Sequence, residues 1–227
     1  MTIHGTHAEP AQAAANARIA GIVLVAATLL SILMMAHHPS VGAHDAAAAV
    51  AEMSAKADLS RIVHGVLIAL IGAEFFAFLV LCDRLGAGRN VVRAGLVAYA
   101  IGTGAMIGAA LISGFVISAL ASHYDGLSAA DAATFVDLSR LSMAGNQALA
   151  KLGVLAMSAA IIAWSIALLR DRTNRWLAVV GFIAGAAPAV ALLAGAIRLD
   201  VVGMTIVVLC QAVWNVFAGV QLIRAKI

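Results

Sequence analysis

Six long apolar runs constrain this 227-residue chain more than any other feature of its sequence. A helix needs about 20 consecutive apolar residues to cross a bilayer. None of the runs alternates polar and apolar residues as a membrane β-strand does, and a helix satisfies its own backbone hydrogen bonds in lipid. The sequence therefore predicts an all-α polytopic membrane protein, with spans at about residues 19–36, 61–82, 93–120, 139–169, 176–197 and 201–223.

The composition excludes a soluble protein. Hydrophobic residues make up 63% of the chain and charged residues only 11%. A soluble domain carries about 25% charged residues, so this chain has too little polar sequence to cover a water-facing exterior. The lipid bilayer is the expected partner, and a net charge of +3 gives no reason to expect a nucleic-acid partner.

Lysine and arginine are distributed unevenly between the predicted loops. Five of them would lie on one side of the membrane and nine on the other. The nine are Arg18, Arg84, Arg89, Arg93, Arg170, Arg172, Arg175, Arg224 and Lys226. Loops rich in Lys and Arg stay in the cytoplasm. We therefore expect a multi-pass protein of a bacterial inner (plasma) membrane, with both termini cytoplasmic.

The chain is expected to form one domain after a short tail. Residues 1–17 are polar and Ala-rich, which predicts a flexible cytoplasmic tail. Residues 18–227 are expected to form a single six-helix transmembrane domain, which could be built from three helical hairpins. The outer loops predict a surface helix at 46–57 and a helix start at Ser128, whereas the connection at 198–200 should be very tight. A cleaved secretory signal in place of the first span is the alternative.

Two pairs of glycines lie four residues apart within predicted spans. They are Gly104 with Gly108 and Gly181 with Gly185. Such spacing lets two membrane helices approach closely. The first interpretation of these two glycine pairs is that they allow close packing between helices of the same chain. A subunit interface is the alternative, and it would make the chain a homo-oligomer or a component of a membrane complex.

The first half of the chain carries a resemblance. Arg18-Ile-Ala-Gly21 leads into the first span, an Ala-rich outer loop follows, and Ala57-Asp-Leu-Ser-Arg61 enters the second span. This order resembles a family of small six-span bacterial integral membrane proteins of unknown function. The resemblance implies the six-span fold, and it transfers no catalytic residues.

Glu74 is a carboxylate in the middle of the second predicted span. An ionised acid there is costly, and such residues usually face the interior of the bundle. Counting residues from the cytoplasmic end of each span places Asn215 and Gln211 near the same height, together with Thr28, Thr103 and Ser158. Two hypotheses stay open. Glu74 is protonated and hydrogen-bonded to Asn215 or Gln211, or it belongs to a proton or cation relay.

Histidines gather at the predicted outer ends of spans one to three. His37 and His64 lie at the same height as Lys151, and His38 and His123 lie slightly higher. With nearby methionines, the four histidines could bind copper or zinc, or ligate a haem b. With Lys and Arg, the same layer would suit an anion or a lipid headgroup. The third interpretation is ordinary interfacial histidine.

The fourth span carries a polar stripe. Asp137, Arg140, Gln147 and Lys151 recur at helical spacing, and Asn146 flanks them. Lipid penalises such a stripe, so it should face the bundle or a wet cavity. This predicts an outward-facing polar cavity between spans one to four. A direct pair between Glu74 and Lys151 is not expected, because their heights differ by about 15 Å.

These features favour a small transporter or a membrane binding protein over an enzyme. Phosphate-binding loops, nucleophile elbows and a second deep carboxylate are missing from the sequence, and no catalytic residue is assigned. The candidate cavity residues, for a small-molecule or ion substrate, are Glu74, Asn215, Gln211, Gln147, Lys151 and Asn146. A haem- or metal-binding redox protein and a non-catalytic accessory subunit are the alternatives.

Overall fold

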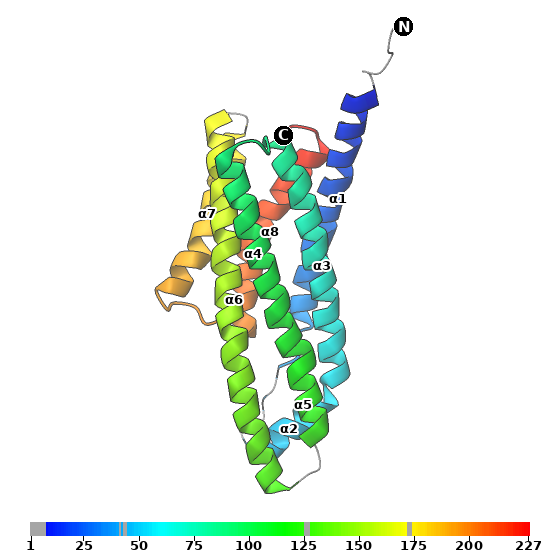
Figure 1. Ribbon diagram of the computed structural model, residues 1–227, viewed down its shortest axis with the longest axis vertical. Helices are drawn as coiled ribbons and strands as arrows, with labels where there is room; N and C mark the ends of the chain where they lie inside the picture. The colour runs from blue at the N-terminus through cyan, green and yellow to red at the C-terminus, as the bar shows by residue number, and fades with distance from the viewer. Residues whose placement is uncertain (1–7, 41, 43–44, 125–127, 172–173) are drawn as a thin grey trace.

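The computed structural model describes residues 8–40, 42, 45–124, 128–171 and 174–227. The described residues are helical apart from short connections (Figure 1). This confirms the predicted all-α class. The elements are α1 (Ala8–Ala36), α2 (Ala46–Ala55), α3 (Ala57–Arg84), α4 (Asn90–Leu111), the π-helical turn η1 (Ile112–Val116), α5 (Ile117–Tyr124), α6 (Ala129–Asp171), α7 (Arg175–Leu193) and α8 (Val201–Ile223).

Six helical stretches are long and apolar enough to cross a membrane. They are α1, α3, the continuous run α4–η1–α5, α6, α7 and α8. Large apolar side chains cover their outer faces, as at Leu141, which is 73% exposed, and Ile62, which is 63% exposed. Such surfaces suit lipid and not water. The chain is therefore a multi-pass membrane protein.

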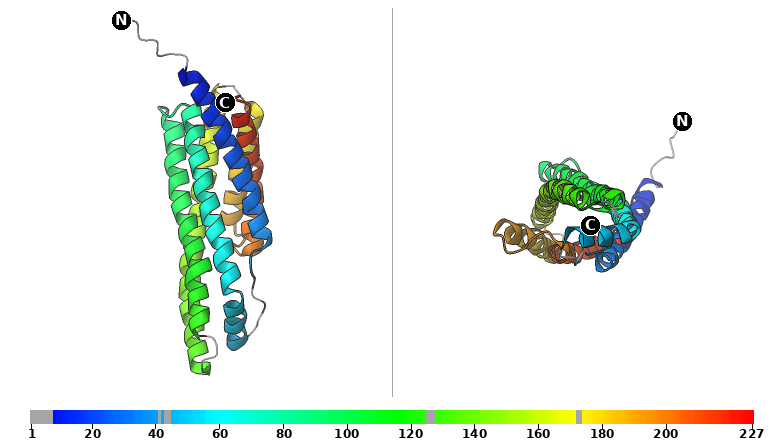
Figure 2. Two further views of the ribbon diagram at one scale, coloured as in Figure 1. Left: turned by 90° about the vertical axis from the view of Figure 1, so that its right-hand side faces the viewer. Right: turned by 90° about the horizontal axis from the view of Figure 1, so that it is seen from below.

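The long helices form one elongated bundle (Figures 1 and 2). Helix α4 packs along α6, α1 lies against α3 and α8, and α7 lies against α6 and α8. Helix α1 begins and α8 ends at the same end of the bundle, which we call the terminal end (Figure 1). Helices α2 and α5 lie at the opposite end, which we call the distal end.

Helices α5 and α6 reach farther toward the distal end than α1, α7 and α8 (Figures 1 and 2). Helix α6 has 43 residues. That is about 65 Å of helix, against a hydrocarbon core of about 30 Å. The short helix α2 packs there, with Val50 of α2 buried beside Ala121 of α5 and Phe135 of α6. The predicted surface helix is confirmed, and so is the predicted helix start, where Ser128 and Asp131 bond to each other.

Two predicted boundaries are wrong. The tail of residues 1–17 is helical from Ala8 onward, because its alanines are strong helix formers, and Ala17 is already fully buried in the bundle. Residues 1–7 lie outside the described residues. The connection between α7 and α8 covers residues 194–200 and is looser than expected, since Gly195 takes a left-handed φ of 71° just after α7.

The glycines of the two pairs differ in how closely other helices approach them. A Cβ on Gly181 would lie 2.1 Å from Ser165 Oγ, and one on Gly185 would lie 2.8 Å from the Ser158 carbonyl oxygen. Helix α7 therefore uses its glycines for close packing on α6. In contrast, a Cβ on Gly104 would meet no atom within 4 Å. The use of that position as a subunit interface stays a prediction.

Candidate functional site

A cavity of about 310 Å³ opens in the distal half of the bundle. A second hollow of about 230 Å³ adjoins it, and the two share His38, His64, Ser113 and Met143 in their walls. Side chains from α1, α3, α4, α6 and α8 contribute to the larger cavity. Besides the shared four, its lining includes Met35, Leu67, Ala110, Asn146, Gln147, Asp200 and Met204.

Two histidines meet at the boundary between the cavity and the second hollow. The Nε2 atoms of His38 and His64 are 3.2 Å apart, and their ring centroids are 4.8 Å apart at an interplanar angle of 71°. His64 is buried on the inner face of α3. His38 follows the end of α1 and is partly buried. Burial lowers the pKa of His38, although its hydrogen bond to the Pro39 carbonyl opposes this.

A π-helical turn makes room for this pair. Gly114 lies in η1, opposite α3, and a Cβ at this position would lie only 2.3 Å from the Cβ of His64. Single π-helical turns within α-helices occur often at functional sites. Here the turn and its glycine allow the backbone after α4 to approach the imidazole of His64 directly.

Helix α6 supplies two amides to the larger cavity. Asn146 is buried, and its Nδ2 donates to the Ala109 carbonyl at 3.1 Å and also to Ser113 Oγ. Gln147 Nε2 donates to the Leu199 carbonyl at 2.8 Å. Both residues were among the predicted cavity residues, and both lie in its wall.

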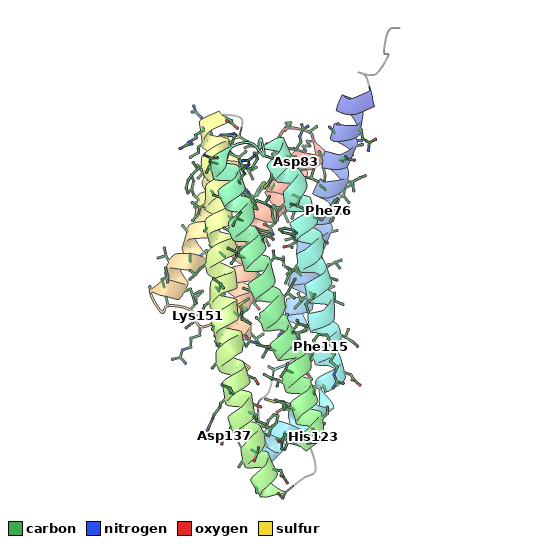
Figure 3. All side chains as sticks on the ribbon, viewed as in Figure 1. Phe76, Asp83, Phe115, His123, Asp137 and Lys151 are labelled. Atoms are coloured by element: carbon green, nitrogen blue, oxygen red, sulfur yellow. The ribbon has the colours of Figure 1, made fainter. Side chains whose placement is uncertain are left out.

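Lys151 does not reach this cavity. Its side chain is exposed on the outside of α6, beside the loop that contains Arg198 (Figure 3). A long cationic side chain that can reach water avoids the desolvation that the bundle interior would impose. The larger cavity therefore includes Asn146 and Gln147 but not Lys151, and a role for Lys151 at a substrate site stays a prediction.

Glu74 lies farther from the distal end than the cavity, where helices α1, α3 and α4 meet. Thr28 of α1 donates to Glu74 Oε1 at 3.1 Å, and the hydroxyl of Tyr99 of α4 donates to Oε2 at 3.4 Å. Both partners are buried, at 2% and 3% exposure, so the carboxyl points into the bundle. His64 lies ten residues before Glu74 on the same helix, which is about 15 Å along α3.

The predicted partners of Glu74 make other contacts. Gln211 Nε2 donates to Ser158 Oγ at 3.5 Å. Asn215 Oδ1 is buried and finds no hydrogen-bond partner among the described residues. The hydrogen bonds expected between Glu74 and these amides are therefore wrong. Height along the membrane carries no information about which way each side chain points around its helix.

The predicted cluster of four histidines separates into a pair and two single residues. His37 is exposed, and its Nδ1 donates to the Leu33 carbonyl at 2.9 Å. His123 is exposed on α5 beside Tyr124, far toward the distal end (Figure 3). Among the described residues, no three His, Cys, Asp or Glu side chains gather in a group that could hold a metal ion.

Several site residues were missed by sequence reasoning. Tyr99, Ser113 and Gly114 belong to the site, and all three lie on the α4–η1 stretch that the sequence presents as an ordinary apolar span. Of these three residues, only Tyr99 could have been identified from the sequence, because it is an aromatic residue with a hydroxyl group inside a predicted span. No family model, curated protein or solved structure matches the chain. The six-span family expected from the first half therefore stays a prediction.

Proposed function

We propose that this chain is a small transporter or membrane binding protein, whose distal cavity takes up a small solute from outside the cell. The observation that carries the proposal is an asymmetry along the bundle axis. Polar side chains converge on a cavity in the distal half, whereas fully buried aromatic rings fill the terminal half. This asymmetry supports a site that solutes reach from one side only.

The cavity has the properties of a ligand site. Its volume of about 310 Å³ lies at the lower end of the range of about 300–1,000 Å³ for small-molecule pockets. The walls are mostly apolar, with a few convergent polar groups from different helices, namely His38, His64, Asn146 and Gln147. Few polar groups in an apolar wall suit one small ligand better than bulk water.

A line of polar groups leads from the cavity toward Glu74. On α1, Thr28 and Ser31 are buried one turn apart, and Met35 of the cavity wall follows one turn later. On α4, Thr103 lies one turn beyond Tyr99, and its buried hydroxyl finds no partner among the described residues. Buried polar groups are normally satisfied, by water if not by protein. The line supports a hydrated path between the cavity and Glu74.

Aromatic rings close the other half. Phe78, Trp164 and Trp214 are fully buried and lie with ring centroids 5.0–5.8 Å apart. Phe78 lies one turn beyond Glu74 on the terminal side of α3, and Tyr99 contacts it edge-on with centroids 4.6 Å apart. The hydroxyl of Tyr99 therefore connects this aromatic cluster to the carboxyl of Glu74.

This connection supplies a mechanism for coupling. A charged carboxylate within the bundle is costly, and protonation removes that cost. Protonation also changes one Glu74 oxygen from an acceptor into a donor, which alters its bonds to Thr28 and Tyr99. Because Tyr99 packs on Phe78, a change in the Tyr99 hydrogen bond would alter the packing of the aromatic cluster. In the proposed scheme, the proton on Glu74 selects between an open and a closed terminal half.

Cysteine accessibility tests the cavity. The native Cys82 and Cys210 are first replaced by alanine. Ala110→Cys then places a thiol in the cavity wall, and the neighbouring Leu111→Cys places one on the lipid-facing surface, where Leu111 is 45% exposed. We expect a membrane-impermeant thiol reagent, added outside intact cells, to label the first variant and not the second. Equal labelling of both, or of neither, would contradict an outward-open cavity.

A further inference from the structure

The tautomers of the two facing histidines are determined by their neighbours. His64 Nδ1 lies 2.8 Å from the Ser60 carbonyl oxygen, and His38 Nδ1 lies 3.0 Å from the Pro39 carbonyl oxygen. A carbonyl oxygen only accepts, so each Nδ1 must carry a hydrogen. Ser60 Oγ is a weaker candidate partner for His64, because it is 3.4 Å away.

This leaves two lone pairs facing each other. A neutral imidazole has one N–H group, and in both rings it is already used at Nδ1. The two Nε2 atoms, 3.2 Å apart, are therefore both acceptors. Two acceptors at this distance repel, unless a proton or a metal cation lies between them. The non-ligating nitrogen of each ring, Nδ1, is held in place by a backbone carbonyl, as in many histidine metal ligands.

The surroundings favour a soft metal cation over a proton. Met35, Met143 and Met204 line the cavity with the histidines, and Met53 lines the adjoining hollow. Half of the chain's eight methionines thus gather around this pair. A thioether is a poor partner for a proton, but it is a ligand that selects Cu(I) among the biological metals.

The distance between the nitrogens fits one metal geometry. For an ion held at roughly 2.0–2.1 Å from both Nε2 atoms, the nitrogen–metal–nitrogen angle would be about 100–106°, near the tetrahedral angle. An ion lying in both ring planes at that distance would place the ring centroids about 5 Å apart, by the same bond length. The observed centroid distance is 4.8 Å.

Two other metal centres fit less well. Two axial ligands of a haem iron lie on opposite sides of the metal, which requires their nitrogens to be about 4 Å apart and not 3.2 Å. Zinc takes four ligands from histidine, cysteine, carboxylate and water, and no third such side chain joins the pair within the described part of the chain. Asp200 lines the cavity, but its Oδ1 caps α8 by accepting from the Gly203 amide at 2.9 Å.

We propose that His38 and His64, through their Nε2 atoms and with thioethers of Met35, Met143 or Met204, bind one Cu(I) ion in the distal cavity. The proposal names the ligand class of that cavity and rests on the proposed function in this respect. A monovalent ion suits the site, since the imidazole and thioether ligands are all neutral and would give a divalent ion no compensating charge.

Metal titration of the purified full-length chain tests the proposal. The probes are Cu(I), kept reduced and buffered by a colorimetric chelator, and Ag(I), which has the same ligand preferences and no redox chemistry. We expect one equivalent of either ion per chain. We expect His38→Ala to weaken binding by at least about tenfold, whereas His37→Ala, on the adjacent exposed residue, leaves it unchanged. His38 is only partly buried, so its variant should fold.

A conservative variant tests the thioethers. Met143 lines both hollows, and Met143→Leu keeps its size while removing the sulfur, so affinity for Ag(I) should fall by about tenfold. Absence of Ag(I) and Cu(I) binding would overturn the proposal, as would binding that tolerates His38→Ala or prefers Zn(II). If Ala110→Cys is labelled from outside but no metal binds, the cavity stands and its assignment to copper fails.

Discussion

The close approach between η1 and α3 makes Gly114→Ala the most informative single substitution. The added Cβ would lie 2.3 Å from His64 Cβ and 2.6 Å from its Cγ. Carbon atoms in contact are about 3.5–4.0 Å apart, so the overlap exceeds 1 Å. His64 Cβ is fixed to the backbone of α3, and no side-chain rotation can move it away. The two helices must therefore separate.

The cost of this separation can be compared with a matched control. Overpacking a well-packed interior costs about 1–3 kcal/mol of unfolding free energy. Gly104→Ala lies on the preceding helix α4 with open space around its Cβ, and it should gain about 0.5–1 kcal/mol from helix propensity. We therefore expect the two alanine variants to differ by about 1.5–4 kcal/mol, with Gly114→Ala the less stable.

Equilibrium unfolding in mixed micelles measures this difference. Trp164 and Trp214 are fully buried, so their fluorescence reports loss of the bundle interior. In the same samples, Gly114→Ala should weaken Ag(I) binding, because the shift of His64 separates the two Nε2 atoms. Unfolding free energies within about 0.5 kcal/mol of each other would refute the reasoning, since the expected difference starts at about three times that value.

Four further predictions concern other parts of the structure. Trp164→Ala should cost about 3–5 kcal/mol of unfolding free energy by circular dichroism, whereas Trp176→Ala, at a side chain 82% exposed, should change it by less than about 0.5 kcal/mol. Thr28→Val should cost only about 0.6 kcal/mol, typical of a hydrogen bond between membrane helices. Glu74→Gln should keep Ag(I) binding but remove the pH dependence of Ag(I) uptake into proteoliposomes, and an unchanged pH profile would contradict its coupling role. Arg89→Ala breaks a partly exposed ion pair and should cost less than about 1 kcal/mol, with less effect at high salt.

Much of the candidate site could be anticipated from local rules. The burial of Glu74, the two amides of α6 and the histidines near the distal end all follow from the cost of polar groups in lipid and from counting 1.5 Å per residue. The identities of the contacts could not be anticipated. Glu74 bonds to Thr28 and Tyr99 and not to Asn215 or Gln211.

The sequence by itself determined the class of the fold and the number of apolar spans found among the described residues. These properties depend on the length of apolar runs and on a constant helical rise, which need no knowledge of neighbouring helices. Only the tertiary structure decided which of four distal histidines form a pair. Each residue turns a helix by about 100°, so a small change in phase moves a side chain to another face. Helix packing and the π-helical turn at Gly114 set that phase, and both arise from contacts between distant segments.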